Sequence, residues 1–321
     1  HATPWGHHVN EGLVEWPPSP WRLMRAFIAT GFAKLGWSAV PETGQRLIDR
    51  LSAVLPRYSL PPASLAHSRH YMPIGVLAKG REKTTLVFDA WAKVGDGQLA
   101  VRWDVNLAPE ERALFAELVG SLSYLGRSEA WVEGRVVVEG EPLPPGKESI
   151  PCDGVFHPGP GWEQVPLLAP LSAPAYLEWR GDIVEPLLKD CPLPTGKKPP
   201  KKVLTQRAKI EESYPADLLA CLQTDTAWLQ EKGCSQPPGS RRVFYWRRTD
   251  ALEVGPPEVA RVRTANPVEA MLLALATPSG NKGALPPVTR TLPQAELLHR
   301  ALVGVINPSA GNPCPVITGT D

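Results

Sequence analysis

The clearest pattern of hydrophobic and polar positions in the chain lies over residues 20–36. Its apolar side chains recur at the three- and four-residue spacing of one helix face, at Trp21, Met24, Phe27, Ile28, Phe32 and Leu35. Ser19 suits the N-cap, Pro20 the first helical position and Gly36 the C-terminal end. The pattern predicts a helix that buries one face in a core, with Arg22 and Arg25 on a neighbouring face.

Further patterns continue through the first 140 residues. In residues 98–105, apolar Leu99, Val101 and Trp103 alternate with polar side chains, as in a half-buried strand. Gly95 and Gly97 favour a hairpin between this strand and the one before it. The predicted elements after the first helix are a helix over 43–55, strands over 84–94 and 98–105, a helix over 109–125 and a strand over 131–138.

This order of elements predicts the fold class. One strand placed before His1 would complete a β-α-β-β-α-β unit, the ferredoxin-like or RRM-like arrangement. We therefore expect an α+β domain over residues 1–140, with a four-stranded antiparallel sheet, two helices on one face and a first strand that precedes residue 1.

The rest of the chain is expected to hold two more segments. Proline is frequent in residues 139–202, which favours semi-rigid connections, and helices are predicted at 175–189 and 215–232. Residues 141–240 are therefore interpreted as a Pro-rich connector with short helices. Residues 241–321 are interpreted as the beginning of a second, similar module that is cut short, with strands at 241–248 and 258–265 and helices at 267–276 and 293–306.

Composition narrows the class of protein. The 321 residues are 43% hydrophobic and 21% charged, which is enough apolar material for packed cores, and the formal net charge is only +1. A nucleic-acid ligand would therefore need a local basic patch. The five cysteines form no close pair, so no zinc ribbon is predicted and a reducing cytoplasm is expected. No apolar run reaches the ~18 residues of a membrane span, and we expect no cofactor.

Three short segments near the N-terminus form a distinctive motif. They are His1-Ala2-Thr3-Pro4-Trp5-Gly6, Val9-Asn10-Glu11-Gly12 and Glu15-Trp16-Pro17-Pro18-Ser19-Pro20-Trp21-Arg22. This motif resembles the fused Cas-five/Cas-six subunit of type I-G (formerly I-U) CRISPR systems, the Csb-two family. Residues 285–289, 296–302 and 315–319 also resemble the family's Cas-six half, in which a Gly-His-x-His-Ala motif would follow.

The resemblance implies two ferredoxin-like RAMP modules. It implies that the chain binds guide RNA (crRNA) in a Cascade-like antiviral complex and seats its 5′ handle. The implied partners are a Cas-seven-like backbone subunit, a large subunit and, through the guide, target DNA. The full-length fusion is expected to process the precursor RNA by metal-independent cleavage, through a half that lies beyond Asp321.

Residues 64–83 are the first candidate for RNA contact. They show little helical or strand pattern and carry one acid, Glu82, against His67, Arg69, His70, Tyr71, Lys79, Arg81 and Lys83. Basic groups neutralise phosphates, and aromatic rings stack on unpaired bases. The resemblance identifies this segment with the family's thumb. A solvated surface loop is the alternative.

Two arginine pairs are further candidates. Arg22 and Arg25 flank the predicted core helix, and pairing with Glu11 or Glu15 explains them equally well. Arg241 and Arg242 precede an aromatic strand that could stack bases, although an edge strand with protective charges has the same pattern.

Catalytic and metal sites are weakly indicated. His1, His7 and His8 could form a metal site, and a stand-alone metal-dependent nuclease is the alternative function, but no carboxylate or cysteine lies at ligand spacing. His299 lies beside an apolar stripe and favours a structural role. We assign no catalytic residue and no metal ligand within these residues.

Overall fold

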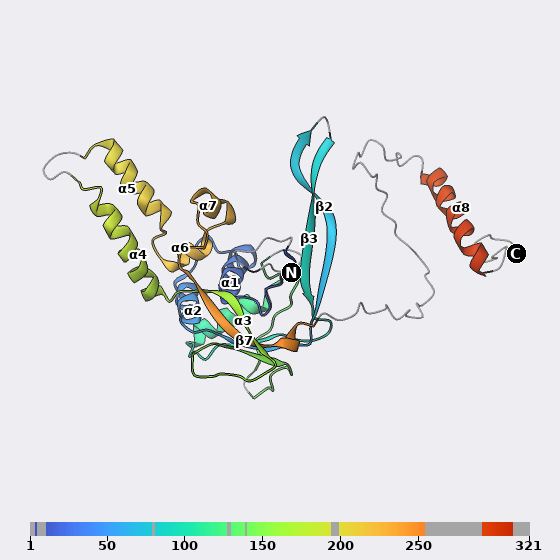
Figure 1. Cartoon of the computed structure of the whole chain (residues 1–321), viewed down its shortest axis with the longest axis horizontal. Helices are drawn as coiled ribbons and strands as arrows, with labels where there is room; N and C mark the ends of the chain where they lie inside the picture. Colours follow the sequence, from blue (N-terminus) through green and yellow to red (C-terminus); the bar gives the residue numbers. More distant parts are fainter. Residues whose placement is uncertain are drawn as a thin grey trace. The chain divides into compact units, whose positions relative to one another are not determined.

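The structure is a computed structural model that describes residues 4, 11–78, 81–126, 130–138, 140–193, 199–253 and 291–310. The chain divides into two compact units, residues 1–72 with 84–257, and residues 73–83 with 258–321. Its elements are α1 (Pro20–Lys34), α2 (Glu42–Ala53), β1 (Arg57–Leu60), β2 (Ser64–Ala78), β3 (Arg81–Lys93), β4 (Ala100–Arg102), α3 (Pro109–Gly120), β5 (Lys147–Pro151), β6 (Trp162–Pro170), α4 (Ala173–Lys189), α5 (Lys201–Ser213), α6 (Leu218–Gln223), α7 (Thr226–Glu231), β7 (Ser240–Arg248), the short helix η2 (Thr249–Ala251) and α8 (Thr291–Ala310) (Figure 1). The α+β class is confirmed.

The main sheet has five antiparallel strands in the order β4-β1-β5-β7-β6, and β2 and β3 form a separate two-stranded sheet. The main sheet takes strands from all three predicted segments. β1 and β4 lie in residues 1–140, β5 and β6 in residues 141–240, and β7 begins at Ser240. Residues far apart in sequence therefore complete one sheet.

The hairpin predicted through residues 95–97 is wrong. β3 pairs with β2, while β4 pairs with β1, where Tyr58 lies opposite Val101. The pattern missed β1 because that strand has only four residues and lies between Pro56 and Pro61. The predicted strand over residues 131–138 is also wrong, since it holds only an isolated bridge between Tyr124 and Trp131. Trp131 and Val138 are exposed, so burial of these two side chains contributes little to an extended strand there.

Two strands lie in the segment that was interpreted as a Pro-rich connector. β6 contains Pro166, and proline is rare in central strands because it cannot donate to a neighbour. β6 tolerates it because β6 lies at the edge of the main sheet, where β7 is its single neighbour among the described strands. The helix predicted over residues 215–232 is divided into α6 and α7, and Asp225 caps α7 by accepting from the backbone N–H of Trp228.

The helix predicted over residues 20–36 is confirmed as α1. The Ser19 hydroxyl accepts a hydrogen bond from the backbone N–H of Arg22, and Met24 and Phe27 are buried. The Phe27 ring meets the ring of Phe115 on α3 edge to face at 5.5 Å. α1, α2 and α3 pack against one another, and α1 and α2 also contact β6.

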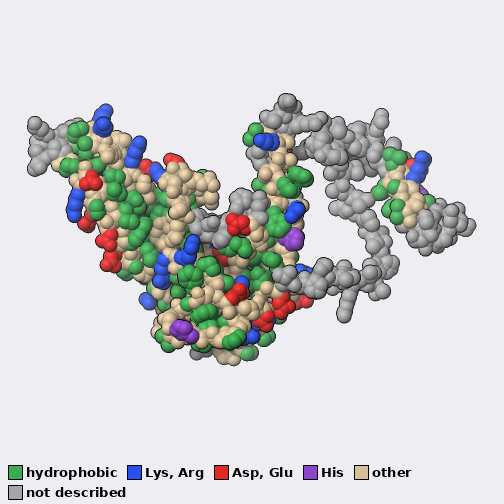
Figure 2. Space-filling model, viewed as in Figure 1, with side chains coloured by type: hydrophobic (Ala, Val, Ile, Leu, Met, Phe, Trp, Pro, Cys, Tyr) green, Lys and Arg blue, Asp and Glu red, His purple; other side chains and the backbone are tan. Residues whose placement is uncertain are grey.

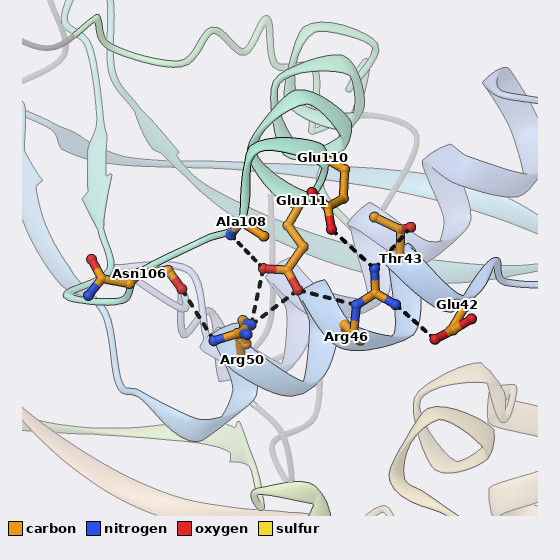
Figure 3. Close-up of polar contacts among 8 residues, drawn as sticks. All are labelled: Glu42, Thr43, Arg46, Arg50, Asn106, Ala108, Glu110 and Glu111. Atoms are coloured by element: carbon orange, nitrogen blue, oxygen red, sulfur yellow. Dashed lines mark hydrogen bonds and ion pairs between the residues drawn. The ribbon is translucent and has the colours of Figure 1, made fainter.

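A buried carboxylate joins α2 to α3. The side chain of Glu111 is 1% exposed, and it accepts a hydrogen bond from the backbone N–H of Ala108, one turn earlier. The guanidinium groups of Arg46 and Arg50 on α2 surround the same carboxylate (Figure 3). Among the described helices, none has the length and apolar character needed to cross a bilayer.

Candidate nucleic-acid interface

The described residues of the segment 64–83 lie in two strands, although the sequence of this segment shows little strand pattern. β2 spans residues 64–78, and β3 begins at Arg81. β2 and β3 pair with each other, and two positions separate them in the sequence. They therefore run antiparallel, because parallel strands need a longer crossover. Most of the described side chains near this turn are exposed, so the alternation of apolar and polar residues that marks a half-buried strand is missing.

Three of the residues that were predicted to contact RNA lie at alternate positions of β2. His67, Arg69 and Tyr71 therefore point to the same face of the hairpin, because successive side chains of a strand point to opposite faces. All three are exposed, and Tyr71 is 71% exposed. This face presents a cation, an imidazole and a phenol side by side.

The ring of Phe88 on β3 contacts two of these side chains. Its ring lies 5.0 Å from the His67 ring, centroid to centroid, and 5.5 Å from Cζ of Arg69. A guanidinium over an aromatic ring is attracted by the negative face of the ring. Phe88 therefore holds His67 and Arg69 in place on the hairpin.

Gly12 of the N-terminal motif lies close to the Phe88 ring. Gly12 has a φ of 70°, and a Cβ at this position would lie 2.6 Å from Cε1 of Phe88. Only glycine adopts this φ easily and also leaves room for such an approach. Alanine at position 12 would therefore strain the backbone and displace the Phe88 ring.

The remaining candidates of the hairpin are only partly described. Lys83 is exposed on β3. His70 lies on β2 and Arg81 begins β3, but their side chains are outside the described part, as is all of Lys79. Figure 2 shows Lys or Arg, histidine and hydrophobic side chains along the surface of this hairpin.

Arg22 and Arg25 are engaged inside the protein. Nε of Arg22 donates to Oε1 of Glu15 at 2.8 Å, as one of the two sequence interpretations expected. Nη1 of Arg25 donates to the backbone carbonyls of Leu222 and Thr224. Burial and then the charge of Arg22 lower the pKa of the Arg25 guanidinium, whereas Asp225 raises it. These contacts give both arginines a structural role.

Arg241 and Arg242 lie on opposite faces of the sheet. Buried Val243 and Tyr245 mark the core face of β7, so Arg241 lies on that side, while Arg242 shares the other face with Phe244. Both arginines are exposed. Only Arg242 lies on the face that carries the exposed aromatic ring.

Arg247 belongs to the core. Its Nε and Nη2 donate to Oε1 of Glu163 at 3.1 and 2.6 Å, and its Nη1 donates to the carbonyl of Trp16. The indole N–H of Trp16 donates in turn to the carbonyl of Ala251. These hydrogen bonds connect Trp16 of the N-terminal motif to the C-terminal end of β7.

The described residues contain no group of three or more His, Cys, Asp or Glu side chains that could hold a metal ion. His1, His7 and His8 lie outside them. His299 lies exposed on α8, which confirms the helix predicted over residues 293–306.

Sequence reasoning missed two aromatic positions. Phe88 lies in the predicted strand over residues 84–94, but nothing local shows that it faces His67. Trp162 lies under the guanidinium of Arg248, at 5.6 Å, although 86 positions separate them (248 − 162). In both cases the signal is an aromatic residue in one strand and an arginine in another.

Comparison with protein-family models, with curated proteins and with solved structures finds no match for this chain.

Proposed function

We propose that this chain is an RNA-binding subunit of a type I CRISPR effector complex, in which the β2–β3 hairpin grips the 5′ handle of the guide RNA. The observation that carries the proposal is the exposed face of the hairpin, where His67, Arg69 and Tyr71 lie at alternate positions and Phe88 supports the first two. The specific effector family comes from the resemblance of the N-terminal motif.

The chemistry of this face suits single-stranded RNA. Arg69 can neutralise a phosphate while its guanidinium stays on Phe88, and exposed Tyr71 offers a ring to an unstacked base. Lys83 adds a second cation on β3. Proteins that bind single-stranded RNA combine basic groups for the phosphates with aromatic rings for the bases.

The ferredoxin-like fold is part of this proposal. β1 and β4 are antiparallel neighbours, and the β2–β3 hairpin is inserted between them in the sequence. In a β-α-β-β-α-β unit the two central strands pair directly. α1 and α2 before β1, and α3 after β4, match the helices of such a unit. Under this interpretation the hairpin extends the loop between the central strands.

The partners follow from the same proposal. They are the crRNA, a Cas-seven-like backbone subunit, a large subunit and, through the guide, target DNA. Processing of the precursor RNA is proposed for the full-length fusion.

The test is RNA binding as a function of salt. Fluorescence anisotropy with a labelled single-stranded RNA that carries the cognate handle measures Kd for the wild-type chain and for a variant with Arg69, Lys79, Arg81 and Lys83 changed to Ala. The slope of log Kd against log salt should shrink by about 0.7 for each lost phosphate contact. An unchanged slope contradicts the proposed role of the hairpin.

A second arm addresses cleavage. The chain should bind the precursor RNA equally well in EDTA and leave it intact, because we assign no catalytic residue within it. Specific cutting that EDTA abolishes would instead support the metal-dependent nuclease, and the N-terminal histidines would then be mutated first.

A further inference from the structure

The outer face of the five-stranded sheet is a second basic and aromatic surface. Residues directly opposite each other on antiparallel strands point to the same face. Phe244 therefore shares its face with Pro166, Trp246 with Gln164, and Arg248 with Trp162. Tyr245 is buried and points the other way, toward the core.

Aromatic rings are exposed on this outer face. Phe244 is 47% exposed, and Phe156 from the loop after β5 is exposed as well. The Phe156 ring meets the Trp162 ring edge to face at 5.9 Å, and its carbonyl accepts from the indole N–H of Trp246. The Phe156 and Trp162 rings therefore contact each other, while the Phe244 side chain is exposed to solvent.

Arginine side chains predominate among the charged residues of the outer face, which favours the binding of a polyanion. Arg57 and Arg102 oppose each other on β1 and β4, and by register they share the face of Arg242. These three arginines make no ion pair among the described residues, whereas Arg248 lies 3.7 Å from Asp250. Glu148 is the acid that the register places among them, and Asp153, in the loop after β5, interacts electrostatically with Arg57.

We propose that this outer face, centred on Phe244 and Arg242, is a stacking platform for single-stranded RNA. Phe244 stacks on a base, and Arg242 neutralises a neighbouring phosphate. The exposed edges and faces of unpaired bases are available to such a platform, whereas bases in a duplex are stacked on one another. The inference rests on the proposed function, because it assigns the same ligand a second contact away from the hairpin.

The test uses a fluorescein-labelled single-stranded RNA of mixed sequence and the full chain. Phe244→Ala should weaken binding roughly 5- to 150-fold, the range of one lost base stack. Phe244→Trp should restore binding, and Phe244→Leu should not, because leucine is apolar without a ring. Arg242→Ala should reduce the salt slope by about 0.7, while Phe244→Ala should leave the slope unchanged.

Matched controls separate this platform from the rest of the surface. Leu177→Ala removes an exposed apolar side chain from α4, and Arg112→Ala removes an exposed cation from α3, and neither should change Kd. Ultraviolet crosslinking of wild-type protein to 4-thiouridine RNA should label a peptide containing Phe244. This arm does not depend on the folding of any variant.

The outcomes distinguish the two proposals. No binding by the wild-type chain refutes the proposed function itself. Binding that the hairpin variant weakens but Phe244→Ala does not, with crosslinks confined to β2 and β3, refutes only the platform and leaves the face to a protein partner.

Discussion

Nε of Arg50 on α2 lies between the two carboxylate oxygens of Glu111 on α3, 3.1 Å from Oε1 and 3.0 Å from Oε2 (Figure 3). Oε2 of Glu111 also accepts from the backbone N–H of Ala108 at 2.9 Å, so one buried side chain both caps α3 and joins it to α2. Because the two arginines around it are about half exposed, water screens much of the attraction.

Removing this carboxylate should destabilise the protein. We expect Glu111→Ala to lower the free energy of unfolding by about 1–3 kcal/mol, because a helix cap and charge-assisted hydrogen bonds are lost together. The measurement is urea unfolding followed by tryptophan fluorescence. Glu110→Ala is the control, since that exposed side chain lies 3.5 Å from Arg46, and its effect should stay within about 0.5 kcal/mol. Equal effects of the two changes would contradict the central role of Glu111.

The contribution of Glu111 should depend on pH. The hydrogen bond from Ala108 lowers the pKa of this carboxyl, opposed by burial and assisted by Arg50. A lowered folded-state pKa gives stability that is fully present above the unfolded pKa of about 4.3 and is lost as the pH falls through the folded pKa. The stability difference between wild type and Glu111→Gln should therefore be constant near neutral pH and shrink in acid. A difference that grows in acid would reverse this assignment.

Gly12 and Gly36 make a matched pair for testing the contact between the N-terminal motif and the hairpin. Both have a φ of 70°, but a Cβ on Gly12 would lie 2.6 Å from the Phe88 ring, whereas a Cβ on Gly36 meets nothing within 4 Å. Each change to Ala should cost about 1–2 kcal/mol for the backbone. Gly12→Ala should cost more and also weaken RNA binding, because Phe88 must move. Equal unfolding free energies for the two variants would show that the Phe88 contact has no energetic weight.

The Tyr71 ring should contribute to RNA affinity without contributing to stability. Tyr71→Ala should weaken binding roughly 5- to 150-fold, while Tyr71→Phe keeps the stacking surface and should bind almost as well as wild type. Because the side chain is 71% exposed, unfolding should change by no more than about 0.5 kcal/mol. Tyr124→Ala, at another exposed ring, is the control and should bind normally. Anisotropy titrations at one fixed salt concentration measure the difference.

Arg247 should contribute to the free energy of unfolding, although it lies in the same strand as Arg242, which is proposed to contact RNA. Arg247→Ala leaves Glu163 and the carbonyl of Trp16 without this donor and should cost about 1–3 kcal/mol. Arg247→Lys should not fully compensate, because an ammonium lacks the planar fork that reaches both acceptors. Arg242→Ala is the control and should leave the urea midpoint nearly unchanged. If Arg247→Ala unfolds at the wild-type midpoint, the contact to Trp16 contributes little.

Local signals in the sequence determined α1. The stripe of Met24, Phe27 and Ile28, the cap at Ser19 and the glycine at position 36 act within a few residues of one another, and the structure confirms the helix that they predict. The chemistry of the hairpin was likewise visible in residues 64–83, because the types and order of basic and aromatic side chains do not depend on folding. The conformation of those residues was not, since a strand exposed on both sides carries no apolar alternation.

Only the tertiary structure decided which distant residues meet. The sequence pattern predicted that β3 and β4 pair, whereas in the structure β4 pairs with β1 and β7 lies between β5 and β6, with the buried rings of Tyr58 and Tyr245 in contact. The four arginines of β7 look alike in sequence, yet Arg247 lies in the core and Arg242 lies on the open face. Periodicity tells which residues share a face of an element, whereas the partner of that face is set by apolar burial summed over the whole chain.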